Sequence, residues 1–176
     1  MLRTIAVIVV LAVVVVLVLA TRKPDHFRVQ RSASIDAPPE RIYPLINDFH
    51  RWGAWSPYEH KDPDMKRTFR GSIYEWAGNS NVGSGRMEIV ESSAPSKITI
   101  QLDFLKPFEA HNIATFTMEP AGGATNVTWV MDGSTPFVGK IMHVFLHMDR
   151  MVGTDFEAGL ANLKTAVEHE PARSAS

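Results

Sequence analysis

Residues 5–20, IAVIVVLAVVVVLVLA, form an uninterrupted apolar run, and this run restricts the possible folds more than any other feature of the chain. As a helix it spans about 24 Å, slightly less than the ~30 Å hydrocarbon core of a bilayer. A helix satisfies every backbone polar group within one segment, so lipid favours it despite the many valines. The run predicts an N-terminal transmembrane helix within residues 1–21.

The alternative is a cleaved signal sequence that begins at Arg3 and ends at an imperfect cleavage site at 18–20. The apolar run is longer than the usual signal-sequence core of about 7 to 15 residues, and Arg22-Lys23-Pro24 follows it directly. We therefore favour an uncleaved, single-pass anchor at the membrane. Basic residues flank both ends of the run, so the side of the membrane that holds the rest of the chain is left open.

The rest of the chain has the composition of one soluble domain. All basic residues except Arg3 lie beyond the run, as do all 19 acidic residues. No stretch of five like charges occurs there. This balance lacks the positive surface that nucleic-acid binding needs, so no nucleic-acid partner is expected. The absence of cysteine excludes a disulfide framework, a thiolate metal site and a cysteine nucleophile.

Alternating polarity predicts strands over most of the region that follows a linker at 22–26. The first strand begins at Phe27, whose apolar neighbours recur at every second position up to Ile35. Further strand-like runs are separated by turn-forming residues and occupy 65–73, 74–77, 83–92, 97–105, 109–118 and 125–132.

Helical patterns frame these strands. Pro38 and Pro39 can begin a short helix with an apolar stripe, and 48–58 is typical of a short helix followed by a loop. From 138 to 168 apolar residues recur at three- and four-residue spacing, which predicts one long amphipathic helix before a tail at 171–176. The fold class is therefore α+β, with a curved antiparallel sheet of six or seven strands around the long C-terminal helix. Such a sheet can leave an apolar gap beneath the helix.

The order of several motifs resembles the START-like (SRPBCC) superfamily of polyketide cyclases, dehydratases and lipid-transport proteins. The matching pieces are SIDAPPERIY at 34–43, WxxWSP at 52–57, the Tyr74-x-Trp76 pair followed by GSG at 83–85, VTW at 127–129 and GLxNLK at 159–164. The resemblance implies a helix-grip, ligand-binding domain over 27–170, with a hydrophobic ligand held between sheet and helix. It carries no shared catalytic residue set and implies no cofactor.

Aromatic, methionine and aliphatic side chains are the candidates for lining that gap, because sulfur and aromatic rings suit an adaptable apolar pocket. The predicted ligand-binding residues are Trp52, Trp55, Tyr58, Tyr74, Trp76, Leu102, Phe104, Trp129, Met131, Phe145 and Met148. Each of them could instead belong to an ordinary packed core.

Acid–base chemistry would need an ionisable group inside an apolar pocket. His111 is the best single candidate because it shares a strand face with Ile113, and the alternative is a polar residue on a solvated strand face. His143 and His147 have the i, i+4 spacing of a metal-binding pair, but the sequence shows no third ligand, so no metal site is predicted.

Three functions fit these observations. The leading hypothesis is a membrane-tethered protein that binds or transports a lipid or other hydrophobic small molecule. The second is a cyclase or dehydratase-like enzyme that uses a buried acid or base, and the third is a co-chaperone-like protein-interaction module. A carrier predicts an apolar site, an enzyme predicts converging polar groups, and an interaction module predicts a filled core with an exposed apolar patch.

Overall fold

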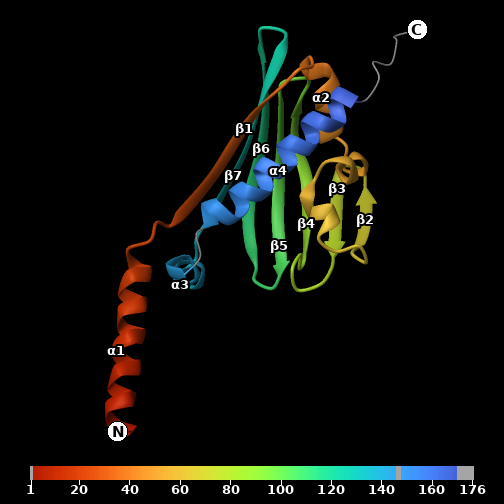
Figure 1. Ribbon diagram of the computed structural model, residues 1–176. Helices are drawn as coiled ribbons and strands as arrows, with labels where there is room; N and C mark the ends of the chain where they lie inside the picture. The colour runs from red at the N-terminus through yellow and green to blue at the C-terminus, as the bar shows by residue number, and fades with distance from the viewer. Residues whose placement is uncertain (1, 146–147, 170–176) are drawn as a thin grey trace, which may run out of the picture.

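The computed structural model describes residues 2–145 and 148–169 (Figure 1). Its helices are α1 (Leu2–Thr21), α2 (Pro39–Ile46), α3 (Phe137–Phe145) and α4 (Met148–His169), with short 3₁₀ helices η1 (Phe49–Ala54) and η2 (Pro57–His60). The strands are β1 (His26–Ile35), β2 (Lys66–Arg70), β3 (Ile73–Ala77), β4 (Ser84–Ser93), β5 (Lys97–Lys106), β6 (Ala110–Ala121) and β7 (Ala124–Ser134).

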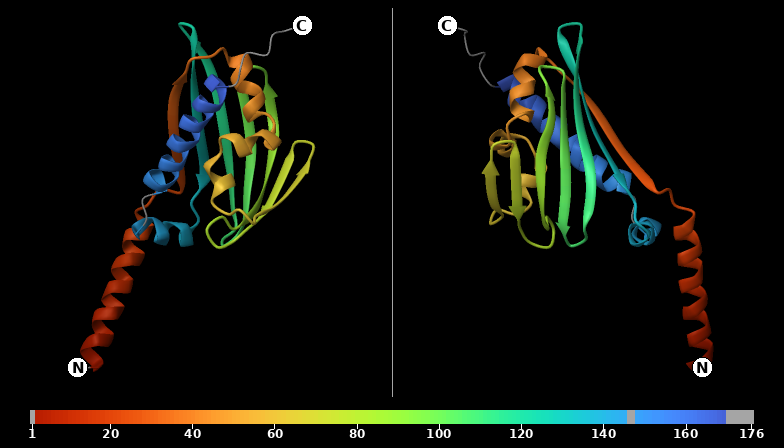
Figure 2. Two further views of the ribbon diagram at one scale, coloured as in Figure 1. Left: turned by 45° about the vertical axis from the view of Figure 1, so that its right-hand side comes forward. Right: turned by 180° about the vertical axis from the view of Figure 1, so that it is seen from behind.

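The seven strands form one antiparallel sheet in the order β1-β7-β6-β5-β4-β3-β2. Neighbours in this order are joined by short turns, except that β1 closes on β7 from the other end of the chain. The curved sheet wraps one side of α4 and leaves β1 and β2 as its two edges (Figures 1 and 2). The predicted α+β helix-grip architecture is confirmed.

The core lies between the sheet and the helices, on what we call the inner face of the sheet. Strand alternation places Ile98, Ile100, Phe116 and Met118 on this face, and all four are buried. From the other side α4 contributes a stripe at four- and three-residue spacing, composed of Phe156, Leu160, Leu163 and Val167.

The η1–η2 segment closes the core beside α4. The indole Nε1 of Trp52 donates to the Ile46 carbonyl oxygen at 2.9 Å, and that of Trp55 donates to the Leu45 carbonyl oxygen at 3.0 Å. Because both buried N–H groups find backbone acceptors, the two rings can be fully enclosed. The aromatic segment therefore fixes α2 to the sheet.

The prediction of one long helix over 138–168 is wrong, because the structure has two helices here, α3 and α4. The reason is a competing contact: α3 packs beside α1, and Lys140 Nζ donates to the Asp25 carboxylate in the linker before β1. The apolar periodicity continues from α4 back to Phe145, but this side chain is 66% exposed. Periodicity alone could not reveal that the first two turns leave the sheet.

Candidate functional site

The middle of the inner face is filled by aromatic rings. Trp129 on β7 stacks on Phe156 of α4, with centroids 3.9 Å apart and planes only 8° from parallel. Trp55 is fully buried, and its ring makes T-shaped contacts with the rings of Phe116 and Trp129. Rings in van der Waals contact leave no room for a guest, so the predicted gap does not exist at this point between sheet and helix.

The predicted ligand-binding residues fall into four groups. Those that are buried in the packed core are Trp52, Trp55, Tyr74, Trp76, Trp129 and Met131. Those that are half-buried at its border are Tyr58, Leu102 and Phe104. Phe145 is exposed on α3, away from the inner face, and the side chain of Met148 lies outside the described residues.

Towards the end of the sheet at which β1 begins, the inner face is less completely covered. The register places Met87 beside Leu102, and Phe104 lies two residues further along β5. All three are only half-buried, as is Phe27 on β1. We call these four residues, Phe27, Met87, Leu102 and Phe104, the open inner face.

Asn112 is a polar residue at the centre of this surface. It pairs with Leu102 on one side and with Gly133 on the other, and it is 5% exposed. Its Oδ1 accepts no hydrogen bond from any described residue, although an unpaired buried acceptor costs on the order of 1–3 kcal/mol. A side chain at position 133 would collide with Oδ1 and with the Phe27 ring, so Gly133 makes the space for this amide.

A second polar group borders the same surface at Tyr74, which is paired with Met87. The Tyr74 hydroxyl donates to Glu59 Oε1 at 2.7 Å, and Arg67 Nε binds Glu59 Oε2 at 2.8 Å. Burial, followed by the neighbouring Glu59 carboxylate, raises the pKa of Tyr74 well above its usual range. The three groups satisfy one another and leave the tyrosine protonated at neutral pH.

His111 lies on the opposite, outer face of the sheet. Its Nδ1 is 2.8 Å from Asp103 Oδ1, and this hydrogen bond raises the pKa of the imidazole above its ordinary value. Ile113 shares this face with His111, as expected, but the face is exposed to solvent. The residues of β6 that point inward are Asn112, Ala114 and every second residue after them. His111 is therefore not inside an apolar pocket.

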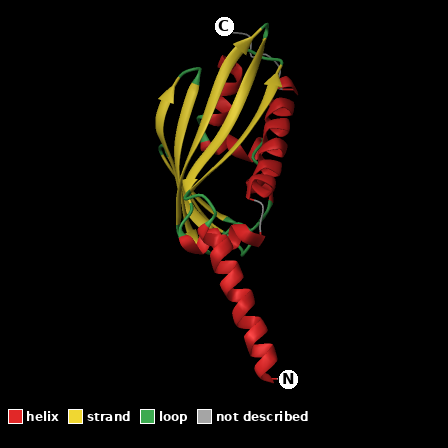
Figure 3. Cartoon of the chain, turned by 90° about the vertical axis from the view of Figure 1, so that its left-hand side faces the viewer, coloured by secondary structure: helices red, strands yellow, loops and turns green. Residues whose placement is uncertain are grey.

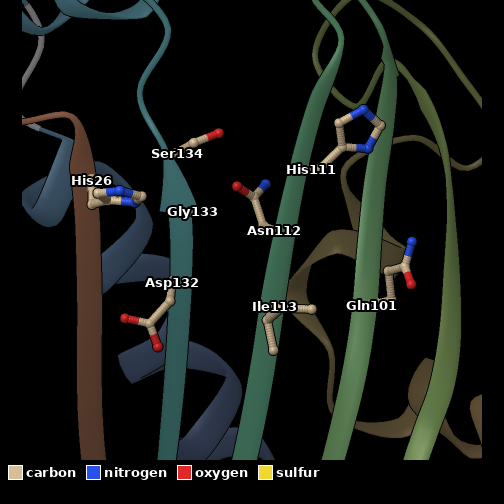
Figure 4. A pocket seen from close by; sticks show the side chains of 8 residues that line it. All are labelled: His26, Gln101, His111, Asn112, Ile113, Asp132, Gly133 and Ser134. Atoms are coloured by element: carbon tan, nitrogen blue, oxygen red, sulfur yellow. The ribbon is translucent and has the colours of Figure 1, made fainter.

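A shallow depression of about 350 Å³ lies beside His111 on the outer face (Figure 4). Its lining residues are His26, Gln101, His111, Asn112, Ile113, Asp132, Gly133 and Ser134. Asp132 is bound to Arg28 at 2.8 Å, and no group of three potential metal ligands occurs among the described residues. The depression is open to solvent and has none of the apolar enclosure that a lipid chain requires.

The sequence matches one family model over residues 26–168, which covers the sheet, the aromatic segment and α4. The chain belongs to the polyketide cyclase/dehydrase and lipid transport family. The predicted superfamily is thereby confirmed. A comparison with curated proteins found no match.

Solved structures share this family fold at low sequence identity. Protein CV1439 from Chromobacterium violaceum has a TM-score of 0.58 and 17% identity, covering 84% of this chain and all of that one. TTHA0849 from Thermus thermophilus has a TM-score of 0.59 and 18% identity, and the match covers 83% of this chain and all of TTHA0849. The di-domain ARO/CYC protein BexL of the BE-7585A biosynthetic pathway has a TM-score of 0.62 and 14% identity. The match covers 87% of this chain and 53% of BexL.

These structural similarities show the fold. The function has to be inferred from the residues of this chain. The family is one of hydrophobic-ligand-binding and cyclase/dehydrase-type folds. The polar residues at the open inner face, Asn112 and Glu59, were not among the predicted site residues. An inward asparagine between apolar positions of β6 was the one available signal for Asn112, whereas no local pattern distinguishes Glu59.

Proposed function

We propose that the protein binds a lipid or another hydrophobic small molecule at the open inner face while tethered to a membrane through α1. The observation that carries the proposal is the row of half-buried apolar side chains around an unpartnered Asn112 amide oxygen. An apolar wall suits a ligand with a greasy body, and a hydroxyl or amide donor on that ligand would satisfy the buried Asn112 Oδ1 once the side chains that cover it move aside.

The anchor supports access to such a ligand. Residues Arg3–Thr21 form one helix long and apolar enough to cross a membrane, with a mean hydropathy of 3.2 and little burial against the domain. A continuous apolar surface around the whole helix would be unfavourable in water, and a membrane span would hold the domain within reach of membrane lipids.

Binding without chemical conversion is favoured by the state of the nearby ionisable groups. Within the described part of the chain, Glu59 beside the open inner face is already bound by Arg67 and Tyr74. Its Oε1 accepts from the Tyr74 hydroxyl and its Oε2 from the Arg67 guanidinium, so both carboxylate oxygens are already engaged within the protein. A cyclase or dehydratase reaction would have to break this cluster first.

Photo-crosslinking tests the proposal in the full chain reconstituted in phosphatidylcholine vesicles. The probe is a fatty acid with a diazirine in its chain, and mass spectrometry locates the adducts. We expect adducts on β4 and β5 around Met87 and Leu102 in addition to adducts on α1. Leu102→Lys should reduce the β4–β5 adducts about tenfold or more, because the lost apolar contact is worth roughly 1.5–3 kcal/mol.

Gln101→Lys is the matched control, since it introduces the same charge on the adjacent residue, which faces the outer side of the sheet. This variant should retain the β4–β5 adducts. Adducts confined to α1 in the unmodified protein would contradict ligand binding at the open inner face. Equal losses in the two lysine variants would show that charge, rather than contact with Leu102, governs the labelling.

A further inference from the structure

One end of the domain exposes several large apolar side chains, which we call the apolar end. Helix α3 contributes Phe137, Val138 and Phe145. The β5–β6 hairpin contributes Leu105 at the end of β5 and Phe108 in the turn, and the first turn of α4 contributes Met151. Each is roughly half exposed or more. Scattered single apolar residues are normal on a protein surface, but three neighbouring segments with this character indicate a contact surface.

The sheet register places this end next to the anchor. His26, the first residue of β1, pairs with Ser134 at the end of β7, and Gly133 pairs with Asn112 near the start of β6. The β5–β6 turn therefore lies at the same end of the sheet as the exit from α1. The views in Figures 1 and 3 show α1 leaving the domain from this end, whereas the β6–β7 turn lies at the far end.

Contacts with the linker fix α3 close to the anchor. The Thr135 backbone N–H donates to the Asp25 carbonyl oxygen at 2.6 Å, and the Lys140 ammonium binds the Asp25 carboxylate. Ala20, near the end of α1, is fully buried, and α3 packs beside α1. In Figures 2 and 3 α3 lies across the domain end of α1 rather than along it.

The arrangement of α3 matches that of a helix lying in a membrane interface. One side of α3 carries an apolar stripe whose residues follow one another after one, three and four positions, namely Phe137, Val138, Ile141 and Phe145. Lys140 lies at the edge of this stripe. If α1 crosses the bilayer, a helix that lies across its end runs parallel to the membrane surface. An amphipathic helix in that position buries its apolar stripe among the headgroups and upper acyl chains.

We propose that the apolar end docks into the surface of the bilayer that α1 spans, with α3 and the β5–β6 turn inserted at headgroup depth. Phe104 of the open inner face directly precedes Leu105 of the apolar end, so docking brings that face to the lipid boundary. A hydrophobic molecule then reaches the site from the bilayer without crossing water. This inference rests on the proposed tether and deepens the proposed function.

Because the chain has no cysteine, a single introduced cysteine gives a unique labelling site. We suggest an NBD label on Val138→Cys or Leu105→Cys in the full chain, reconstituted in phosphatidylcholine vesicles that contain nitroxide-labelled lipid. Both labels should show blue-shifted emission and strong quenching by the lipid. Ala121→Cys, at the exposed end of β6 beside the far turn, is the control and should emit as in water.

A second variant tests whether α3 causes the docking. Phe145→Ser should decrease the lipid quenching of the Leu105 label, whereas Val90→Ser, at an exposed apolar residue of β4, should leave it unchanged. Quenching no greater at positions 105 and 138 than at 121 would overturn the proposal. Extraction of the whole chain by alkaline carbonate would overturn it together with the tether. Lipid quenching without fatty-acid adducts on β4 or β5 would support docking while refuting the proposed ligand site.

Discussion

Replacement of Phe156 by alanine tests whether the centre of the inner face is a packed core. Phe156 is 2% exposed and lies 3.9 Å, ring centroid to centroid, from Trp129. Removing the ring takes away its apolar burial and its stacking contact with Trp129, which itself packs against the fully buried Trp55. The space left behind is lined by large, rigid side chains and can collapse only in part.

The expected loss of stability is large. Phenylalanine-to-alanine changes in protein cores cost about 3–5 kcal/mol, a range that includes the cavity left behind. For a domain of this size each kcal/mol lowers the melting temperature by roughly 2–4 °C, which gives a decrease of about 6–20 °C. Because domains are stable by about 5–15 kcal/mol, Phe156→Ala should remove a substantial part of the total.

Guanidinium unfolding of the full chain in detergent micelles measures this loss through tryptophan fluorescence. All four tryptophans belong to the domain, so α1 contributes no tryptophan signal. Thr165→Ala, at an exposed position of the same helix, should change the free energy of unfolding by no more than about 0.5 kcal/mol. Benzene should partly restore the stability of Phe156→Ala by filling an apolar, dry cavity.

A loss below about 1 kcal/mol for Phe156→Ala would refute the reasoning. It would mean that the ring borders free space, and that the centre of the inner face belongs to the binding site after all. Stabilisation of the unmodified protein by benzene would point the same way.

Two further predictions concern local geometry. In Gly159→Ala the new methyl group would approach a Trp129 ring carbon to 2.9 Å, which should cost about 1–3 kcal/mol of stability and outweigh a helix-propensity gain of about 1 kcal/mol. In Gly153→Ala the methyl group would instead displace the Arg31 guanidinium from Asp149 and Glu157, and these contacts with two exposed carboxylates contribute little to stability. Thermal unfolding should therefore show Gly159→Ala to be the less stable of the two variants, and the reverse order would refute the argument. NMR titration should place the pKa of His111 above 6.5, and Asp103→Asn should lower it. Since the folded-state pKa is the raised one, the pair adds stability below about pH 6.5 that is lost as pH rises through the folded-state pKa, and an unchanged pKa in Asp103→Asn would contradict the assigned cause.

The sequence predicts the strands well because their alternation reflects burial on one face. On β6 the alternation is ambiguous only near its start: Ala114, Phe116 and Met118 mark the inward set of residues, but Ile113 belongs to the other set. Ile113 is apolar yet points outward, whereas Asn112 is polar and points inward, so the local pattern around His111 favours the wrong face. The register with β5 and β7 decides the matter, and register is a property of the assembled sheet.

The candidate site was harder to predict than the fold for the same reason. Large aromatic residues can line a pocket or fill it, and composition cannot distinguish the two outcomes. Trp129 fills the core because Phe156 arrives opposite it from a distant helix. Phe145 has the right spacing for the core, but the attachment of α3 to the linker at Asp25 carries it to the end of the domain.

If α1 tethers the protein to a membrane as proposed, the two edges of the sheet take on added importance. Anchoring confines copies to two dimensions and raises the frequency with which neighbouring domains meet side by side. The edge strand β2 is only five residues long and carries Lys66, Arg67 and Arg70, of which Arg67 is bound to Glu59 and Arg70 to Glu75. Short length and charged side chains discourage two β2 edges from joining into one continuous sheet. The other edge strand, β1, is longer, and its Arg28 is paired with Asp132 of the neighbouring strand. The β2 edge thus gives crowded copies a means of resisting self-association.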